Sequence, residues 1–246
     1  MRMLCVAVLA LVATVSPALG QTPGDRQKAR VANKTGWELM QAESFEKAVA
    51  AFQQSIELDP TFEMSFYGLG RAHLALKQYV SAMSALSRCR DLYIAQVGRQ
   101  FTSQQEAQRY RQDRITELDE MIRQLQSGPQ SLQAQDQLRQ VQEQKRQIQE
   151  FITRGNNITI TSGVPAWVSL SLGSAYFRAG KLPEAETEYK AAIAADPRSG
   201  EAHSNLAVVY LETERFNDAL AEVNAAKKVG FKVNPELEKV IREKAK

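Results

Sequence analysis

The chain has 246 residues, of which 43% are hydrophobic and 24% are charged, and its formal net charge is +3. This length allows one large domain or two small ones. The small net charge does not favour a nucleic-acid-binding protein, which gathers many Lys and Arg side chains on one face.

The first element, residues 1–20, reads MRMLCVAVLALVATVSPALG. A positive charge near its start precedes the twelve-residue apolar run Leu4–Val15, and small residues follow Pro17. This arrangement is typical of a secretory signal peptide, and we predict cleavage before Gln21. The alternative is an uncleaved membrane anchor, although the run is shorter than the roughly 20 residues that cross a bilayer. We therefore expect an exported protein, periplasmic or extracellular, with no membrane segment after cleavage.

Four later segments share one pattern of apolar and small residues. The pattern is clearest at Leu172, Gly173, Tyr176, Leu182, Ala185, Tyr189 and Ala192. A shift of 34 residues places it on Leu206, Ala207, Tyr210, Phe216, Ala219, Val223 and Ala226. Near the start of the chain it falls on Gly36, Leu39, Phe45, Ala48 and Phe52, and again on Gly70, His73, Tyr79, Ala82, Leu86 and Cys89. A period of 34 indicates a helix–turn–helix repeat, in which small residues lie where two helices approach closely.

This pattern resembles the tetratricopeptide repeat family over residues 29–96 and 166–231. The resemblance implies an all-α fold of stacked helical hairpins, with two repeats in each of the two segments. The sequence departs from the family at the usual early Trp, which is replaced in the four repeats by Ala32, Phe66, Ser169 and His203.

Residues 99–155 separate the two pairs of repeats and do not fit the pattern. The block is rich in Gln, and its apolar residues recur at the three-to-four spacing of a coiled coil. A turn at Gly128–Pro129 would make it an antiparallel hairpin that pairs Leu125 with Leu132, Leu118 with Leu138 and Ile115 with Val141. Because such arms pack on each other, we expect the hairpin to project from the repeats and to be separable from them. The alternative is a disordered polar spacer.

The chain ends in a segment, residues 234–246, that predicts a polar capping helix. Asn234 suits the N-cap position, and the Pro that follows it suits the first helical position. Between the hairpin and the third repeat, Asn157-Ile158-Thr159 matches a glycosylation acceptor, which matters only in a eukaryotic secretory route.

The sequence offers no arrangement of residues that indicates catalysis. The two histidines, His73 and His203, occupy repeat positions that normally hold packing residues, and Cys89 occupies a small-residue packing position. No His or Cys cluster has metal-ligand spacing, and no Gly-rich loop follows a strand to hold phosphate. We therefore expect a protein that is not an enzyme and that has neither a cofactor nor a metal.

The resemblance also implies a concave groove that binds a protein or peptide segment and is lined by the first helix of each repeat. Its candidate lining is Arg30, Asn33, Trp37, Met40, Met64, Tyr67, Arg71, Leu74, Trp167, Leu170, Ser174, Phe177, Ser204, Asn205, Val208 and Leu211. We expect the rings of Trp37, Tyr67, Trp167 and Phe177 to be exposed there and to anchor an apolar partner. The alternative is that the two Trp side chains cover the ends of the array or pack on the linker.

These features favour an exported scaffold for protein–protein interactions, for example in envelope assembly or secretion. A second protein could bind the coiled-coil hairpin. The alternative is a non-catalytic accessory subunit of an envelope enzyme. In many family members an Asn at one groove position holds a peptide backbone. Among the four repeats only the last has Asn at this position, Asn205, since Lys34, Gly68 and Ser171 stand at the equivalent places.

Overall fold

The computed structural model describes residues 23–97, 104–127, 132–153 and 163–245, and every regular element within these ranges is a helix. This all-helical architecture confirms the predicted fold class. The helices are α1 (Pro23–Gln41), α2 (Phe45–Leu58), α3 (Glu63–Ala75), α4 (Tyr79–Gln96), α5 (Gln104–Ser127), α6 (Leu132–Thr153), α7 (Ala166–Arg178), α8 (Leu182–Ala195), α9 (Gly200–Glu212), α10 (Phe216–Lys228) and α11 (Pro235–Lys244).

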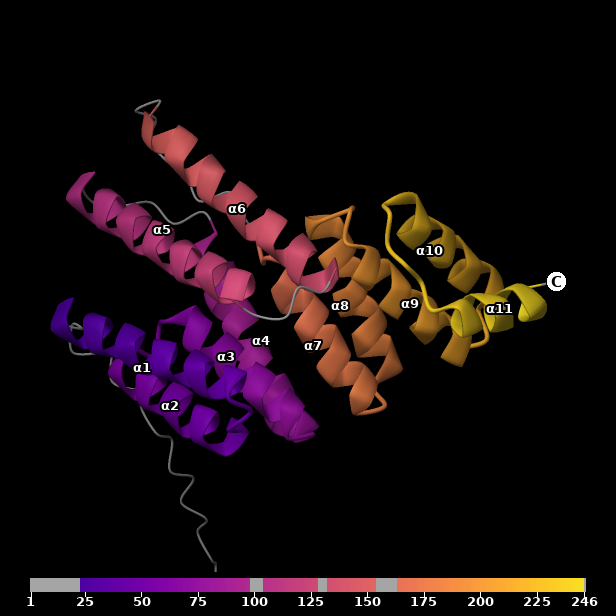
Figure 1. Ribbon diagram of the computed structural model, residues 1–246, viewed down its shortest axis with the longest axis horizontal. Coiled ribbons are helices and arrows are strands. Elements are labelled where there is room, and N and C mark those ends of the chain that lie inside the picture. Colours follow the sequence, from indigo (N-terminus) through magenta and orange to yellow (C-terminus); the bar gives the residue numbers. More distant parts are fainter. Residues whose placement is uncertain (1–22, 98–103, 128–131, 154–162, 246) are drawn as a thin grey trace, which may run out of the picture.

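Eight of these helices form four hairpins, α1–α2, α3–α4, α7–α8 and α9–α10 (Figure 1). The turn inside each hairpin places one residue in the left-handed region, at Glu43, Lys77, Gly180 and Glu214. The next backbone N–H then bonds back to a carbonyl near the end of the first helix, for example from Ser44 N to Leu39 O at 2.9 Å. This bond pattern closes a helix C-terminus and explains why the same turn recurs in each repeat.

Small residues allow the helices of a hairpin to approach closely. A Cβ atom at Gly36 would lie 2.6 Å from Cε1 of Phe52, and one at Gly173 would lie 2.8 Å from Cδ1 of Tyr189. Both rings are essentially fully buried, because Phe52 is 0% and Tyr189 is 2% exposed. The predicted role of the small residues at helix contacts is therefore confirmed.

The two pairs of repeats form one continuous array. Helix α7 packs on α4 in the same way as α3 packs on α2 and α9 packs on α8. Tyr67 and Tyr93 of the second repeat share a buried cluster with Trp167 and Leu172 of the third. The inserted block thus separates the two pairs in the sequence, whereas in space α7 covers the apolar face that α4 presents.

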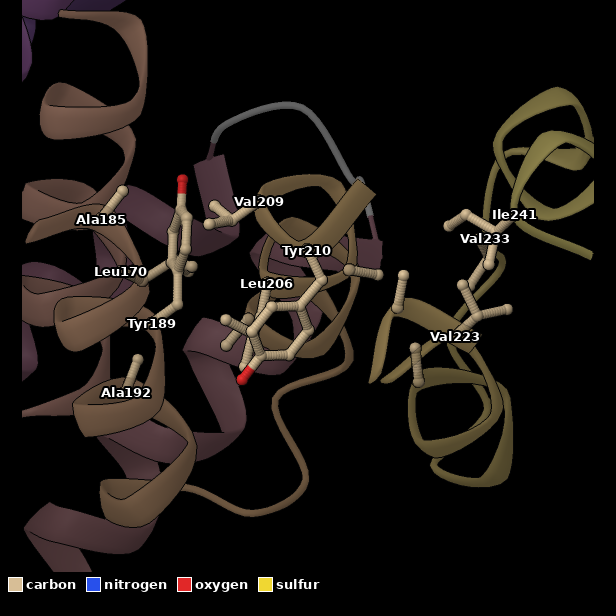
Figure 2. Packing of buried hydrophobic residues seen from close by; sticks show 14 residues of the cluster. Leu170, Ala185, Tyr189, Ala192, Leu206, Val209, Tyr210, Val223, Val233 and Ile241 are labelled. Carbon is tan, nitrogen blue, oxygen red and sulfur yellow. The ribbon is translucent and has the colours of Figure 1, made fainter. Parts of the chain in front are cut away.

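The last two repeats and α11 share a second core. Its buried residues run from Leu170 and Tyr189 through Leu206 and Tyr210 to Ile241, as Figure 2 shows. Helix α11 begins as expected, with Pro in its first turn and the Asn234 side chain accepting a hydrogen bond from the N–H of Glu236 at 2.9 Å. Its Ile241 side chain is 0% exposed, so α11 lies against the end of the array.

The inserted helices α5 and α6 lie side by side and antiparallel (Figure 1). Leu118 and Val141 are fully buried, and Lys145 Nζ lies 2.5 Å from Asp119 Oδ1 across the pair. The pair does not stand clear of the repeats, because Met121 packs against the cluster around Trp167. The pair therefore does not project freely from the repeats, whereas its separability from them stays a prediction.

Some sequence predictions lie outside the described residues. These are the signal peptide at residues 1–20, the turn at Gly128–Pro129 and the glycosylation acceptor at Asn157. Among the helices that the structure describes, none combines the length and the apolar character needed to cross a membrane.

Candidate functional site

The first helices of the four repeats, α1, α3, α7 and α9, line up along one face of the array. Rings mark the line of this face: the centroid of Trp37 lies 5.9 Å from that of Tyr67, and the centroid of Tyr67 lies 4.4 Å from that of Trp167. The predicted groove residues of successive repeats are therefore neighbours in space.

The N-terminal ends of these helices are buried. Tyr67 is 5% and Trp167 is 2% exposed, so the expectation that these two rings are exposed is wrong. Trp167 meets both Tyr67 and Tyr93 edge to face, because α7 stacks directly on the second repeat. The alternative, in which a Trp side chain packs inside the protein, thus describes Trp167 better. Trp167 packs on the second repeat, whereas the alternative named the array ends or the linker. Asn33, Met64 and Leu170 are also buried, and we call these five residues together with Arg30 the covered half of the groove.

The groove residues at the C-terminal ends of α1, α3 and α7, and all of the groove residues on α9, remain partly accessible. We call this region the open half, and its half-buried residues are Trp37, Met40, Arg71, Leu74, Ser174, Phe177, Ser204, Asn205, Val208 and Leu211. Most of these side chains are apolar, so the open half can contact an apolar segment of another protein.

Arg71 is the cation of the open half. Its Nη1 donates a hydrogen bond to Tyr67 Oη at 2.9 Å, and its guanidinium carbon lies 5.8 Å from the centre of the Tyr67 ring. The phenol oxygen of Tyr67, and after it the carboxylate of Glu201 on α9, raise the pKa of Arg71. The guanidinium therefore stays charged at any physiological pH and can meet a carboxylate.

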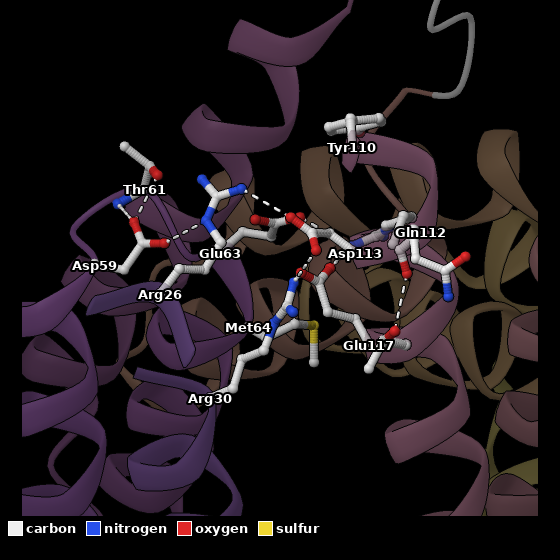
Figure 3. Close-up of polar contacts among 12 residues, drawn as sticks. Arg26, Arg30, Asp59, Thr61, Glu63, Met64, Tyr110, Gln112, Asp113 and Glu117 are labelled. Atoms are coloured by element: carbon white, nitrogen blue, oxygen red, sulfur yellow. Dashed lines mark hydrogen bonds and ion pairs between the residues drawn. The ribbon is translucent and has the colours of Figure 1, made fainter. Parts of the chain in front are cut away.

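Arg26 and Arg30 of α1 bind carboxylates of α5, as Figure 3 shows. The Arg26 guanidinium lies 3.1 Å from Asp59 Oδ2 and 3.1 Å from Asp113 Oδ2. Arg30 Nη2 lies 3.1 Å from Asp113 Oδ1 and 3.4 Å from Glu117 Oε1. The first repeat is thereby tied to the inserted helix at a predicted groove position.

Arg114 of α5 completes this polar cluster from the opposite side. Its Nη1 lies 2.9 Å from Glu63 Oε1 of α3 and 3.1 Å from Glu117 Oε2, and its Nη2 donates to Tyr93 Oη of α4 at 2.9 Å. The guanidinium carbon also lies 5.0 Å from the centre of the Tyr93 ring. Arg114 is only 8% exposed, so it depends on these partners for its charge to be stable there.

Glu117 is the least stable charge of the cluster. Burial, followed by the nearby carboxylate of Glu63, raises the pKa of Glu117 from 4.5 to about 7, although Arg114 and Arg30 act in the opposite direction. Three guanidinium groups face four carboxylates, which makes a proton on one carboxylate favourable.

Sequence reasoning missed the polar face of α5. Asp113, Glu117 and Met121 are four residues apart and follow one stripe of the helix, with Arg114 beside them. This stripe is the sequence pattern that could have predicted the contact. It lies in a Gln-rich helix, and we expected the polar residues of that helix to face solvent.

The two histidines do not share a site. His203 is 9% exposed, its Nδ1 lies 2.6 Å from Glu222 Oε2, and its Nε2 lies 3.3 Å from the carbonyl of Pro197. The hydrogen bond with Glu222 raises the pKa of His203.

Burial raises the pKa of the Cys89 thiol, which is 0% exposed, so this residue packs as expected. Within the described residues, no three His, Cys, Asp or Glu side chains are grouped to hold a metal ion.

Several solved structures are similar to the chain at low identity. A thermophilic tetratricopeptide repeat protein of Thermus thermophilus is 19% identical, with a TM-score of 0.36, and the match covers 88% of this chain and 98% of that one. PilW, a type IV pilus biogenesis factor, is 14% identical, with a TM-score of 0.41 and coverage of 89% and 86%. The TPR2AB domain of yeast Sti1 in complex with pHSP90 is 14% identical, with a TM-score of 0.31 and coverage of 89% and 99%.

No curated protein matches the chain. The tetratricopeptide repeat model matches residues 33–94 and 170–230, which correspond to the four hairpins of the array. These matched segments make up half of the sequence, and the chain belongs to the tetratricopeptide repeat family.

Proposed function

We propose that the protein is an exported scaffold that binds a segment of another protein in the open half of its groove. The observation that carries this proposal is the continuous, half-accessible face along the C-terminal ends of α1, α3, α7 and α9. A face of this kind is a binding surface in tetratricopeptide arrays, and families of this type act mainly through protein–protein contacts.

The side chains of the open half indicate the kind of segment that fits. Leu74, Phe177 and Val208 supply apolar area, and Arg71 supplies one positive charge between them. Asn205 is half-buried at the position where many family members hold a peptide backbone. We infer an apolar segment that carries one carboxylate, placed so that the carboxylate meets Arg71.

Export is the part of this proposal that rests on the sequence alone, through the signal-like residues 1–20. We propose a role in envelope assembly or secretion, without catalysis by this chain. The α5–α6 pair offers a second protein the charged face that carries Glu143, Arg146 and Glu150. The second candidate function is an accessory subunit of an envelope enzyme, which would use the same open half.

A pull-down from envelope extract tests the proposal. The wild-type chain and the double variant Phe177→Ala/Val208→Ala are compared, with Val240→Ala as the matched control, because Val240 lies on α11 and is 37% exposed. We expect the double variant to lose its partner by roughly thirtyfold in affinity, or about 2 kcal/mol. Because Phe177 also packs against the buried cluster of the last two repeats, the comparison is made at a temperature where circular dichroism shows both proteins to be folded. Retention of the same partner by the double variant would refute the open half as the binding surface.

The identity of the partner separates the two candidate functions. A structural component of the envelope favours the scaffold. An enzyme whose turnover falls when this chain is removed favours the accessory subunit. Mass spectrometry of the envelope fraction tests export separately, because a cleaved chain begins at Gln21 and an anchored one retains Met1.

A further inference from the structure

Helix α5 occupies the covered half of the groove. It reaches this region with Asp113 and Glu117, which bind Arg30, and with Met121, which packs against the aromatic cluster around Trp167. These three residues of α5 are spaced at i, i+4 and i+8, so they follow one stripe of the helix. An amphipathic helix that lies in a groove through such a stripe is the geometry of a bound helical partner.

The covered half contains polar atoms whose hydrogen bonds are unsatisfied. Within the described part of the chain, three buried polar atoms of the covered half lack a hydrogen-bond partner: Arg30 Nε, Asn33 Oδ1 and Trp167 Nε1. Asn33 is 3% and Trp167 is 2% exposed, so bulk water does not satisfy these atoms. Buried donors and acceptors without partners weaken the arrangement that contains them.

The charges of the contact are also unbalanced. Glu117 lies in a cluster with one carboxylate more than the guanidinium groups require, and its neighbour Glu63 disfavours a second negative charge. Asp113 is 28% exposed, so water and salt reach the edge of the contact. The contact of α5 with the first repeat therefore contains an unfavourable buried charge and an edge that water reaches, beside the bonds from Arg114 to Glu63 and Tyr93.

We propose that α5 is a displaceable occupant, and that the surface beneath it is a docking site for an acidic amphipathic helix of a partner protein. This inference rests on the proposed function of the chain as a groove-binding scaffold. The partner helix presents two carboxylates at i and i+4 to Arg26 and Arg30, and an apolar side chain at i+8 to the aromatic cluster.

Charge complementarity is the argument for this occupant. Arg26 and Arg30 lie one turn apart on α1, and both are paired here with carboxylates supplied by α5. Removal of α5 leaves the two cations facing the groove beside the buried rings. A helix with the stripe Asp-x-x-x-Glu-x-x-x-Met reproduces the chemistry that the protein already uses at this place.

Displacement is tested first in the full-length chain with Asp113→Lys, which sets a third cation against Arg26 and Arg30. The chain has two Trp residues, Trp37 and Trp167, and both lie on the groove face, so acrylamide quenching of their fluorescence reports opening. We expect at least a twofold rise in quenching with an unchanged helical signal. The charge-swapped variant Asp113→Lys/Arg30→Glu should restore the wild-type value.

Docking is tested with a labelled peptide that has the sequence of residues 104–127. We expect the peptide to bind the Asp113→Lys protein at least tenfold more tightly than the wild type, whose own α5 competes at high effective concentration. A peptide with Asp113→Asn should lose this gain, because Asp113 is the carboxylate that meets both Arg26 and Arg30. The protein variant Phe177→Ala/Val208→Ala should bind the peptide as its parent does, so a failure of the open half and a failure of this site are distinguishable.

Several outcomes would overturn the proposal. Unchanged quenching in Asp113→Lys means that α5 is not displaceable at this contact, and an open protein that ignores the peptide means that the surface is not a docking site. If Asp113→Lys does not fold, Asp113→Asn is judged by the same criteria. A concentration-dependent wild-type dimer in light scattering would overturn the choice of a different protein as partner, because two copies would then exchange α5.

Discussion

Substitution of Glu117 by Gln should stabilise the protein at pH 8 and leave its stability unchanged at pH 4. Glu117 faces Arg30 of α1 and Glu63 of α3, with Asp113 and Arg114 on its own helix. In the folded protein its pKa is about 7, against 4.5 for an ordinary Glu. The neutral side chain is therefore the form that the fold prefers, and Gln supplies a neutral side chain of the same shape.

The sign of the pH dependence follows from proton uptake. Between pH 4.5 and about 7 the unfolded chain has lost the proton of Glu117, whereas the folded protein keeps it. Stability therefore falls as the pH rises through this window and stays lower above it. A pKa difference of this size corresponds to about 3 kcal/mol at 1.36 kcal/mol per unit. Because the cluster can relax around an ionised Glu117, we expect about 1–3 kcal/mol for Glu117→Gln at pH 8.

Urea unfolding of both proteins, followed by circular dichroism at pH 4 and pH 8, measures this difference. Equal denaturant slopes are required, so that the midpoint shift reports stability. Glu143→Gln is the matched control, because hydrogen bonds from Arg146 lower the pKa of Glu143, and its charge is stabilising above pH 4.5. A Glu117→Gln variant that is less stable than the wild type at pH 8 would refute the assignment of Glu117 as an unfavourable buried charge.

Three further changes test the packing of the array. Gly68→Ala should lower the free energy of unfolding by about 1–3 kcal/mol, because the Cβ of Ala would lie 2.2 Å from the buried ring of Phe52, and this clash outweighs the helix propensity of Ala. The control Gly163→Ala has nothing within 4 Å of the new Cβ and should change the free energy of unfolding by less than about 0.5 kcal/mol. Trp167→Ala should lower the free energy of unfolding by about 3–5 kcal/mol in a denaturant titration, and an unchanged midpoint would contradict its buried position. His203→Ala should cost more stability at pH 5.5 than at pH 9, because the contact with Glu222 raises the pKa of His203 and stabilises the fold below 6.5; equal losses at both values would exclude this charge effect.

The repeats could be predicted from the sequence because their signal is local. Three glycines of the pattern contact a side chain of their own hairpin: Gly36 meets Phe52, Gly70 meets Leu86 and Gly173 meets Tyr189. These pairs recur at a fixed spacing, so the residues that make the contact also make the pattern. The same locality explains why the start of α11 at Asn234 was predicted correctly.

The contact between the second and third repeats could not be predicted in the same way. Tyr93 and Trp167 are 74 residues apart in the sequence, and the period of 34 is lost between them. A repeat search measures distance along the chain, whereas stacking depends on which apolar face lies next in space. The expectation that Trp167 is exposed in the groove was wrong for the same reason, because Trp167 fills the contact between the repeats.

The docking of α5 could not be predicted because its partners come from three helices. Arg114 meets Glu63 of α3 and Tyr93 of α4, and Asp113 meets Arg30 of α1. Each of these residues looks like a solvated charge or a packing residue in its own segment. These residues form a buried network only when the helices pack together, and no periodic pattern in the sequence predicts that network.

The position of the insertion explains which half of the groove is covered. Helix α8 ends at Ala195 and α9 begins at Gly200, so the connection between these successive repeats is short. The inserted block stands at the equivalent connection between the second and third repeats, where α4 ends at Gln96 and α7 begins at Ala166. Such connections lie at the edge where the first helices of the repeats begin.

A helix pair inserted at this edge can reach the N-terminal ends of α1 and α3, and Arg26 and Glu63 lie there. The C-cap residues of α2 and α8, Asp59 and Asp196, lie at the same edge. Asp59 pairs with Arg26, and Asp196 pairs with Arg139. The C-terminal ends of the first helices lie at the opposite edge, beyond these contacts. The insertion therefore covers one half of the groove and leaves the other half accessible.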